Sequence, residues 1–306
     1  MPEVQEVLDR HLDLSLEPTL TIRSVYGQDL SWFAALDWEW FRANVARILP
    51  FGRSDSAYFD AAWESFVVFN QPNDSLLREL MPANRRAVAE IGEARMTRSP
   101  ASPDDSLADH LMVYYWRGHL KFEGEDRLLE DFYTYAPDRL RGHAMWFIGR
   151  SASGWAEEAP PEVFERLRSL MDRRLHSAEQ SASPVAFARE LANFGWWFTS
   201  NKFGDGWSIE TLLRVLRLTK KTEAEMDVVK RLAELCSAYP IECVACLGLM
   251  VEGDRDDWVL IGVEEDARQT IKIALESSRP DAVMAARRLV EYLIARGQYG
   301  FRSLLG

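Results

Sequence analysis

Three cysteines in the C-terminal third of the sequence come closest, by residue type and spacing, to a reactive centre: Cys236, Cys243 and Cys246. The last two form a Cys-x-x-Cys pair, which is the spacing of a redox dithiol or of half a zinc site. A structural zinc ion takes four ligands, and the histidine nearest in sequence is the distant His176. The residues around these cysteines are mostly apolar, and free cysteine is among the most buried residue types. The sequence therefore favours three small packing residues and predicts neither a metal nor a cofactor.

Other chemistry-bearing groups are weaker. Asp254-Arg-Asp-Asp257 resembles half of an oxygen-ligand cation loop but lacks the later glutamate, so a solvated turn is the favoured interpretation. His110 and His143 fall on helix faces with apolar neighbours, which indicates core or boundary histidines. The sequence contains no phosphate-cradling Gly-x-x-x-x-Gly-Lys-Ser/Thr loop, no dinucleotide fingerprint and no His-Glu-x-x-His. We predict no catalytic residue and no nucleotide hydrolysis by this chain alone.

Basic residues gather locally in an otherwise acidic chain. We name Arg168, Arg214, Arg217, Lys202 and the aromatic Trp196 as a candidate partner-binding surface. Ordinary solvated helix faces with i,i+4 ion pairs explain the arginines as well. An enzyme with a dispersed active site is an alternative hypothesis.

That alternative active site would lie near four residues of the central stretch, namely Trp196, Asn201, Lys202 and Asp205. A deep pocket with shifted pKa values would favour it. A nucleic-acid-binding helical repeat is a further alternative. The formal net charge of −12 disfavours it, because an acidic surface repels phosphate backbones unless its basic residues share one face.

The elements that must position these residues are helices, organised around residues 183–218. Ser183 followed by Pro184 predicts a helix start, and apolar residues at spacings of three and four continue it to Phe198. A glycine-containing turn follows, and Ser208 is expected to cap a second, antiparallel helix. Aromatic residues crowd the joint between the two helices: Phe194, Trp196, Trp197, Phe198, Phe203 and Trp207. One helix pair cannot bury them all, so neighbouring pairs must stack on it.

Similar helix signals recur along the chain. Asp37 is expected to cap a helix from Trp38, and Pro240 and Pro280 are expected to open two others. Thr222-Glu-Ala-Glu225 has the form of a capping box, followed by an inward face that includes Met226. Residues 258–263 are the one candidate strand. Starts of helix pairs recur roughly every 40 residues, which is the period of HEAT and armadillo repeats.

These signals predict an all-α fold in which antiparallel helix pairs stack as a HEAT-like α-solenoid. Residues 95–106 contain two prolines and no periodicity, so they are the clearest candidate linker. We therefore divide the chain into an N-terminal helical region, residues 1–98, continuous with the array, and a helical repeat region, residues 104–306. No apolar run could span a membrane and no signal peptide is evident at the start, which predicts a cytoplasmic protein.

Residues from about 136 to the end resemble the C-terminal helical-repeat region of large bacterial proteins that carry a signal-transducing NTPase domain upstream. The resemblance rests on residues 137–151, on Phe194-Gly-Trp-Trp-Phe198 with Lys202-Phe203, on Val251-Glu-Gly-Asp-Arg255 and on residues 301–305. Such regions are thought to recognise a partner or trigger, often in defence against phage. The resemblance implies a non-enzymatic protein-interaction or sensor module with a protein partner.

Overall fold

The computed structural model describes residues 2–52, 56–92, 102–123, 126–155, 159–254 and 259–305. Helices are the regular secondary structure of these residues, which contain no strand. The all-α prediction is therefore confirmed. The chain divides into two compact units, residues 1–140 and 141–306. The linker predicted at residues 95–106 lies inside the first unit, where residues 93–101 are outside the described part and a helix already begins at Pro103.

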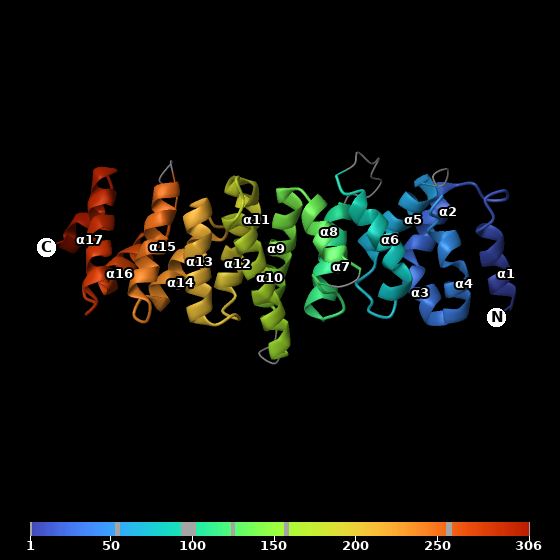
Figure 1. The fold of residues 1–306 in the computed structure, drawn as a ribbon, viewed down its shortest axis with the longest axis horizontal. Helices are drawn as coiled ribbons and strands as arrows, with labels where there is room; N and C mark the ends of the chain where they lie inside the picture. The colour runs from blue at the N-terminus through green and yellow to red at the C-terminus, as the bar shows by residue number, and fades with distance from the viewer. Residues whose placement is uncertain are drawn as a thin grey trace. The chain divides into compact units, whose positions relative to one another are not determined.

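The described residues of the first unit contain the helices α1 (Pro2–His11), α2 (Leu20–Gln28), α3 (Leu30–Leu36), α4 (Trp38–Ile48), α5 (Ser56–Phe69), α6 (Leu77–Ala89), α7 (Pro103–Trp116) and α8 (Leu128–Tyr135). The closest packing is between α2 and α5 (Figure 1), where the backbone of Gly27 lies against that of Ala62. The Asp37 cap is confirmed, because its carboxylate accepts a 2.9 Å hydrogen bond from the Trp40 amide.

The second unit contains the remaining elements: α9 (Asp138–Ser153, begun in the last residues of the first unit), α10 (Pro161–Glu179), η2 (Pro184–Phe187), α11 (Ala188–Ala192), α12 (Phe194–Thr199), α13 (Asp205–Thr219), α14 (Glu225–Leu235), α15 (Pro240–Gly253), α16 (Glu264–Leu275), α17 (Pro280–Ala295) and η3 (Tyr299–Leu305). The predicted starts at Pro240 and Pro280 are confirmed. The candidate strand is wrong, because residues 259–262 form turns before α16; Trp258 lies outside the described residues.

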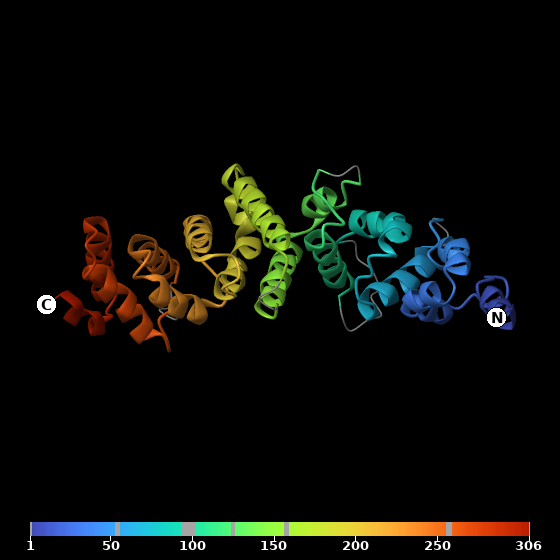
Figure 2. The same cartoon turned by 90° about the horizontal axis from the view of Figure 1, so that it is seen from below.

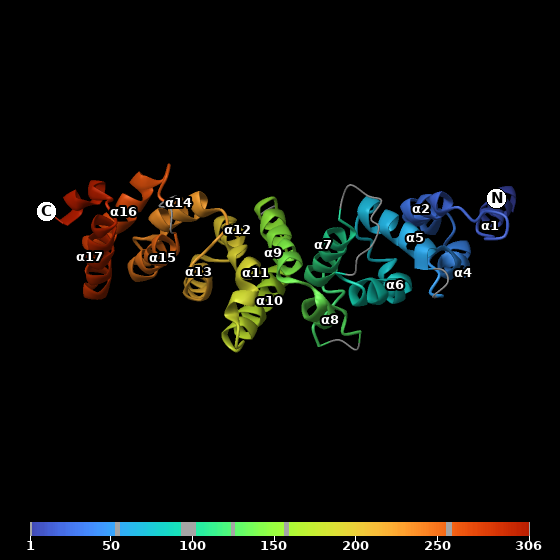
Figure 3. The same cartoon turned by 90° about the horizontal axis from the view of Figure 1, so that it is seen from above.

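Two layers of helices build this second unit. Helices α13, α15 and α17 pack side by side and stand nearly parallel in Figure 1. Helices α12, α14 and α16 form the other layer, and Figures 2 and 3 show α14 and α16 inclined to their partners. Each helix of this second layer is followed in the chain by a partner in the first, which is the stacked-pair repeat that the sequence predicts.

The aromatic joint is the core of the central repeat. Trp197 is fully buried, donates its indole N–H to the Met145 carbonyl at 2.7 Å and stacks on Phe203 at 5.1 Å between ring centroids. Phe203 also contacts Phe164 from α10, and Trp207 from α13. Neighbouring helices therefore supply the contact area that one pair lacks.

The predicted continuous helix from Pro184 to Phe198 is wrong. The chain instead forms a 3-10 turn and two short helices, separated at Phe187 and Asn193, and the Ser183 hydroxyl makes no capping bond. The Arg141 guanidinium donates a hydrogen bond of 2.6 Å to the Ala186 carbonyl. In a continuous helix that carbonyl would accept a backbone hydrogen bond, so a tertiary contact competes with the helix at this point. Ser208 is not a cap either, because α13 already begins at Asp205 after Gly204.

Candidate functional site

The loop between α13 and α14 borders two hollows of the second unit. The capping box predicted at Thr222 is wrong: Thr222 is buried, and its hydroxyl lies 3.4 Å from the Ala192 carbonyl and 3.1 Å from that of Glu223. The Glu223 amide also donates to the Ala192 carbonyl, at 2.8 Å. Helix α14 therefore begins only at Glu225, after Ala224 in the left-handed conformation (φ 54°). Packing against α11 takes the place of a local cap.

Two glycines let neighbouring helices approach this loop. A Cβ on Gly195 of α12 would stand 1.9 Å from the Glu223 carbonyl oxygen, and one on Gly253 of α15 would stand 2.1 Å from that of Lys220. Neither contact is possible for a real side chain, so glycine is required at both positions. The loop is thereby fixed from both sides. It forms a rigid floor between the hollows described next.

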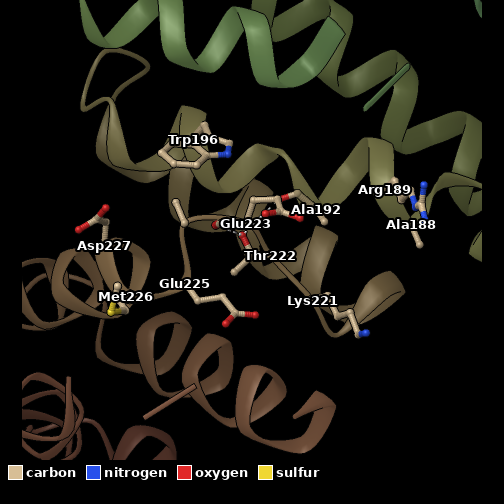
Figure 4. A pocket seen from close by; sticks show the side chains of 11 residues that line it. Ala188, Arg189, Ala192, Trp196, Lys221, Thr222, Glu223, Glu225, Met226 and Asp227 are labelled. Carbon is tan, nitrogen blue, oxygen red and sulfur yellow. Dashed lines mark hydrogen bonds between the residues drawn. The ribbon is translucent and has the colours of Figure 1, made fainter. Parts of the chain in front are cut away.

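The first hollow, the loop pocket, has a volume of about 720 Å³. It lies between α11, α12 and the start of α14 (Figure 4). Its lining residues are Ala188, Arg189, Ala192, Trp196 and residues 221–227. Figure 4 shows Trp196 on one side, Met226 on another, and Glu225 extended between Met226 and Lys221. The pocket therefore offers both apolar and charged contacts.

Two further hollows adjoin the loop pocket. The charged pocket, of about 790 Å³, shares Lys221 and Glu225 with it and is also lined by Arg217, Lys220 and Glu252. Lys220 and Glu252, which both line it, form an ion pair of 2.7 Å. The charged pocket thus lies between the ends of α13 and α15.

The third hollow, the helix groove, has about 360 Å³ and shares Glu252 with the charged pocket. It runs between α15 and α17 over small or apolar residues, among them Ala245, Gly248, Leu249 and Ala285. Neighbouring hollows therefore share lining residues. We call the three adjoining hollows together the repeat surface.

Glu225 is the titratable group most affected by this environment. Burial raises the pKa of its carboxyl group, and the nearby negative charges of Asp254 and Glu223 raise it further, whereas Lys221 acts in the opposite direction. A carboxylate crowded by like charges favours a positively charged neighbour. Glu225 lines both the loop pocket and the charged pocket, so an added positive charge where the two pockets meet would stabilise its carboxylate.

Two of the five residues that the sequence named as a partner-binding surface line hollows of the repeat surface, each a different one. Trp196 lines the loop pocket, with the Arg150 guanidinium 5.0 Å from its ring, and Arg217 lines the charged pocket. The others lie outside the three hollows. Arg168 donates to the Phe203 carbonyl at 2.5 Å, and Lys202 is half-buried.

Arg214 is neutralised by α10. Its guanidinium pairs with Glu179 at 3.0 Å and with Asp172 at 3.5 Å. These contacts raise the pKa of Arg214, the Glu179 hydrogen bond contributing most. Because Arg168 and Arg214 are both engaged within the protein, the five residues do not form one free basic stripe.

The dispersed active site considered from the sequence does not assemble in one hollow either. Asp205 pairs with Arg231 at 2.6 Å, and Asn201 is an exposed residue in the left-handed conformation (φ 60°). Trp196 is the member of the set that lines the loop pocket. The proposed catalytic neighbours thus make separate structural contacts.

Several residues of the repeat surface were missed from the sequence. Met226 was assigned to the inward face of its helix, but it lies in the first turn of α14 at the rim of the loop pocket and is 56% exposed. Glu223 and Glu225 were interpreted only as capping residues. The high density of charged residues at positions 220–227 was the one sequence feature that pointed to a surface site there. Periodicity alone could not show that the loop carrying them borders two hollows.

The three cysteines are buried and free, as expected of packing residues. The Cys236 thiol donates to the Thr270 carbonyl at 3.2 Å. The pKa of Cys243 is raised by its hydrogen bond with Cys236 and by burial, and burial also raises the pKa of Cys246. Within the described ranges, no group of three or more His, Cys, Asp or Glu side chains could hold a metal ion. Residues 255–257 of the acidic turn lie outside those ranges.

Comparison with protein families, with curated proteins and with solved structures gave no match. In the part of the chain that the structure describes, no helix is long and apolar enough to cross a membrane. The fold and the repeat surface define the class of the protein, which is an all-α helical-repeat protein.

Proposed function

We propose that this chain is a protein-interaction or sensor module that acts without catalysis. It serves as a helical-repeat scaffold of a larger signal-transducing NTPase system, or of a partner of such a system, in bacterial defence against phage. The observation that carries the proposal is the repeat surface, a row of three hollows in which neighbours share the lining residues Lys221, Glu225 and Glu252. Stacked repeats commonly bind their partners over such extended surfaces.

The composition of the helix groove supports a protein as the partner. Small residues at Ala245, Gly248 and Ala285 leave room for a partner's backbone or side chains, and Leu249 and Tyr292 offer apolar contacts. Arg288 and Glu252 add charge at the groove. An apolar centre with charged residues around it is the usual anatomy of a protein–protein interface.

The two alternative functions have less support. An enzyme would bring its reacting groups into one pocket, whereas Asp205 is engaged with Arg231 away from Trp196. A nucleic-acid-binding repeat would present a coherent positive stripe, whereas Arg214 is paired with two acidic residues. The link to an NTPase rests on the sequence resemblance, which includes core residues such as Phe203 and the close-packed Gly253.

The proposal is tested by purifying the tagged full-length chain from its native cells and quantifying the co-purified proteins by mass spectrometry. The groove variant combines Leu249→Asp with Arg288→Glu. The control variant combines Gln269→Asp with Lys272→Glu, which changes the net charge equally at two exposed positions of α16. We expect a protein partner that is retained by the wild type and the control and lost by the groove variant. Enrichment of no protein over an empty tag would contradict the proposed function.

A further inference from the structure

Large apolar side chains are exposed beside the loop pocket. Met226 lines the pocket and is 56% exposed, and Ile261 in the turn before α16 is 59% exposed. The two positions are neighbours, because the Met226 sulfur lies 4.0 Å from where a Cβ of Gly262 would stand. Trp196 contributes a half-buried ring to the same pocket. Exposed methionine and aromatic side chains of this kind are enriched at protein interfaces.

Acidic side chains surround these apolar groups. Glu223, Glu225 and Asp227 line the loop pocket, against Arg189 and Lys221 as its cationic residues, and Asp254 adds a negative charge near Glu225. Asp227 also pairs with Lys230 at 3.5 Å, but both side chains are exposed, and such a pair is weak enough to exchange for a partner's cation. Glu223 and Asp227 are exposed, and the chain as a whole carries a formal charge of −12. A positively charged partner is therefore attracted both locally and at long range. An acidic protein or an anionic lipid surface would be repelled by the same negative charge.

We propose that the loop pocket together with Ile261 docks a basic amphipathic helical segment of the partner protein. Its apolar face contacts Met226, Ile261 and Trp196, while its lysine or arginine side chains pair with Glu223 and Asp227. This inference rests on the proposed function, because it assigns the chemistry of the partner. Apolar anchors at helical spacing seated in a groove are a recurring mode of peptide recognition.

The geometry of the floor suits such docking. Glu223 is held against α11 by its amide hydrogen bond, and Gly195 keeps α12 directly beneath it. The acidic side chains therefore project from a backbone that is already ordered, so binding orders few additional groups. The volume of about 720 Å³ accommodates anchoring side chains of the segment rather than the whole helix.

The probes are two fluorescein-labelled synthetic peptides of roughly 18 residues with helical periodicity, one built from leucine and lysine and the other from leucine and glutamate. Fluorescence anisotropy with the full-length protein at about 0.15 M salt measures their affinities. The site variant combines Met226→Ser, Glu223→Gln and Asp227→Asn. The control variant combines Met284→Ser, Glu276→Gln and Glu291→Gln, which removes the same number of charges and one exposed methionine elsewhere.

We expect the lysine peptide to bind and the glutamate peptide not to bind. The site variant should weaken the lysine peptide at least about tenfold and the control variant less than about twofold. Equal weakening by both variants would reveal charge attraction without a site, and equal binding of both peptides would refute the charge preference. No binding of the lysine peptide also contradicts the inference. A partner recovered from cells despite any of these results leaves the proposed function intact.

Discussion

The fully buried carboxylate of Glu190 lies 2.5 Å from the Nε of Arg174. This ion pair joins α11 to α10, and Arg141 of α9 reaches the same carboxylate at 2.6 Å. The centroid of the Phe187 ring lies 5.3 Å from the guanidinium carbon, Cζ, of each arginine. Three helices of the second unit therefore converge on one acidic side chain, at the place where the predicted continuous helix is broken.

Replacement of Glu190 by glutamine removes the buried carboxylate that Arg141 and Arg174 share. Breaking a buried pair from one side typically costs about 3–5 kcal/mol. We therefore expect the free energy of unfolding of Glu190→Gln, measured by urea denaturation, to fall by at least about 3 kcal/mol. The control is Glu179→Gln, an exposed partner of Arg214, which should change it by less than about 1 kcal/mol. Equal effects of the two substitutions would show that the buried cluster has no special role.

Gly195→Ala tests the close approach of α12 to the loop. The added methyl group would overlap the Glu223 carbonyl, so the loop must move and the loop pocket must change shape. We expect a loss of roughly 1–3 kcal/mol, the usual cost of overpacking, despite the higher helix propensity of alanine. In Gly248→Ala, the nearest atom to the new methyl is 3.9 Å away, so stability should be unchanged or increased. The measurement is the thermal unfolding midpoint of both variants. A Gly195→Ala protein as stable as the wild type would rule out the close contact.

His110 should make the first unit sensitive to acid. Its side chain is buried in α7, its Nε2–H donates to the Asn70 carbonyl at 2.9 Å, and burial lowers its pKa to about 4. Below the unfolded-state pKa of about 6.5, the unfolded chain takes up a proton that the folded chain refuses. Stability therefore falls as the pH drops from about 6.5 towards 4, by up to roughly 3 kcal/mol from this group.

The measurement is the free energy of unfolding of the wild type and of His110→Gln across this pH range. The contribution of the carboxylates is common to both proteins, so the difference isolates the histidine. We expect the variant to lose stability less steeply between pH 6.5 and 4. Parallel curves would mean that His110 does not stay neutral in the fold.

The three cysteines should resist modification in the native protein. They are fully buried, and the pKa values of Cys243 and Cys246 are raised. The hydrogen bond with Cys243 lowers the pKa of Cys236, but burial shields that thiol from the reagent as well. With a thiol reagent such as dithiobis(nitrobenzoic acid), we expect slow reaction in buffer and complete reaction of all three in urea. Rapid labelling of the native protein would disprove the assignment as packing residues and favour a redox role.

Local signals in the sequence predicted the elements that depend on local chemistry. Asp37 caps its helix, and Pro240 and Pro280 open theirs, because a cap or a first-turn proline acts within a few residues. Apolar periodicity with the aromatic joint around Trp197 and Phe203 also indicated stacked helix pairs. These features need no knowledge of which helix lies next to which.

The failures have a common physical cause in tertiary contacts. Thr222 has the sequence of a cap, yet its hydroxyl contacts the Ala192 carbonyl of α11, and α14 begins only at Glu225. Arg214 was interpreted as a candidate binding residue, yet α10 supplies two acidic partners from 35 and 42 residues away. Neither partner could be assigned from spacing alone. The repeat surface therefore became visible only in three dimensions, although two of the residues named from the sequence, Trp196 and Arg217, line hollows of it.

The central claim is that the chain works by binding a protein on its repeat surface, and site-specific photo-cross-linking in native cells tests it most directly. A photoreactive residue is placed at Met226, at Leu249, or at the control position Gln269 on α16, and the adducts are identified by mass spectrometry. We predict that positions 226 and 249 give an adduct with the same protein and that position 269 gives none. Absence of an adduct at both surface positions, or equal adducts at all three, would contradict the account.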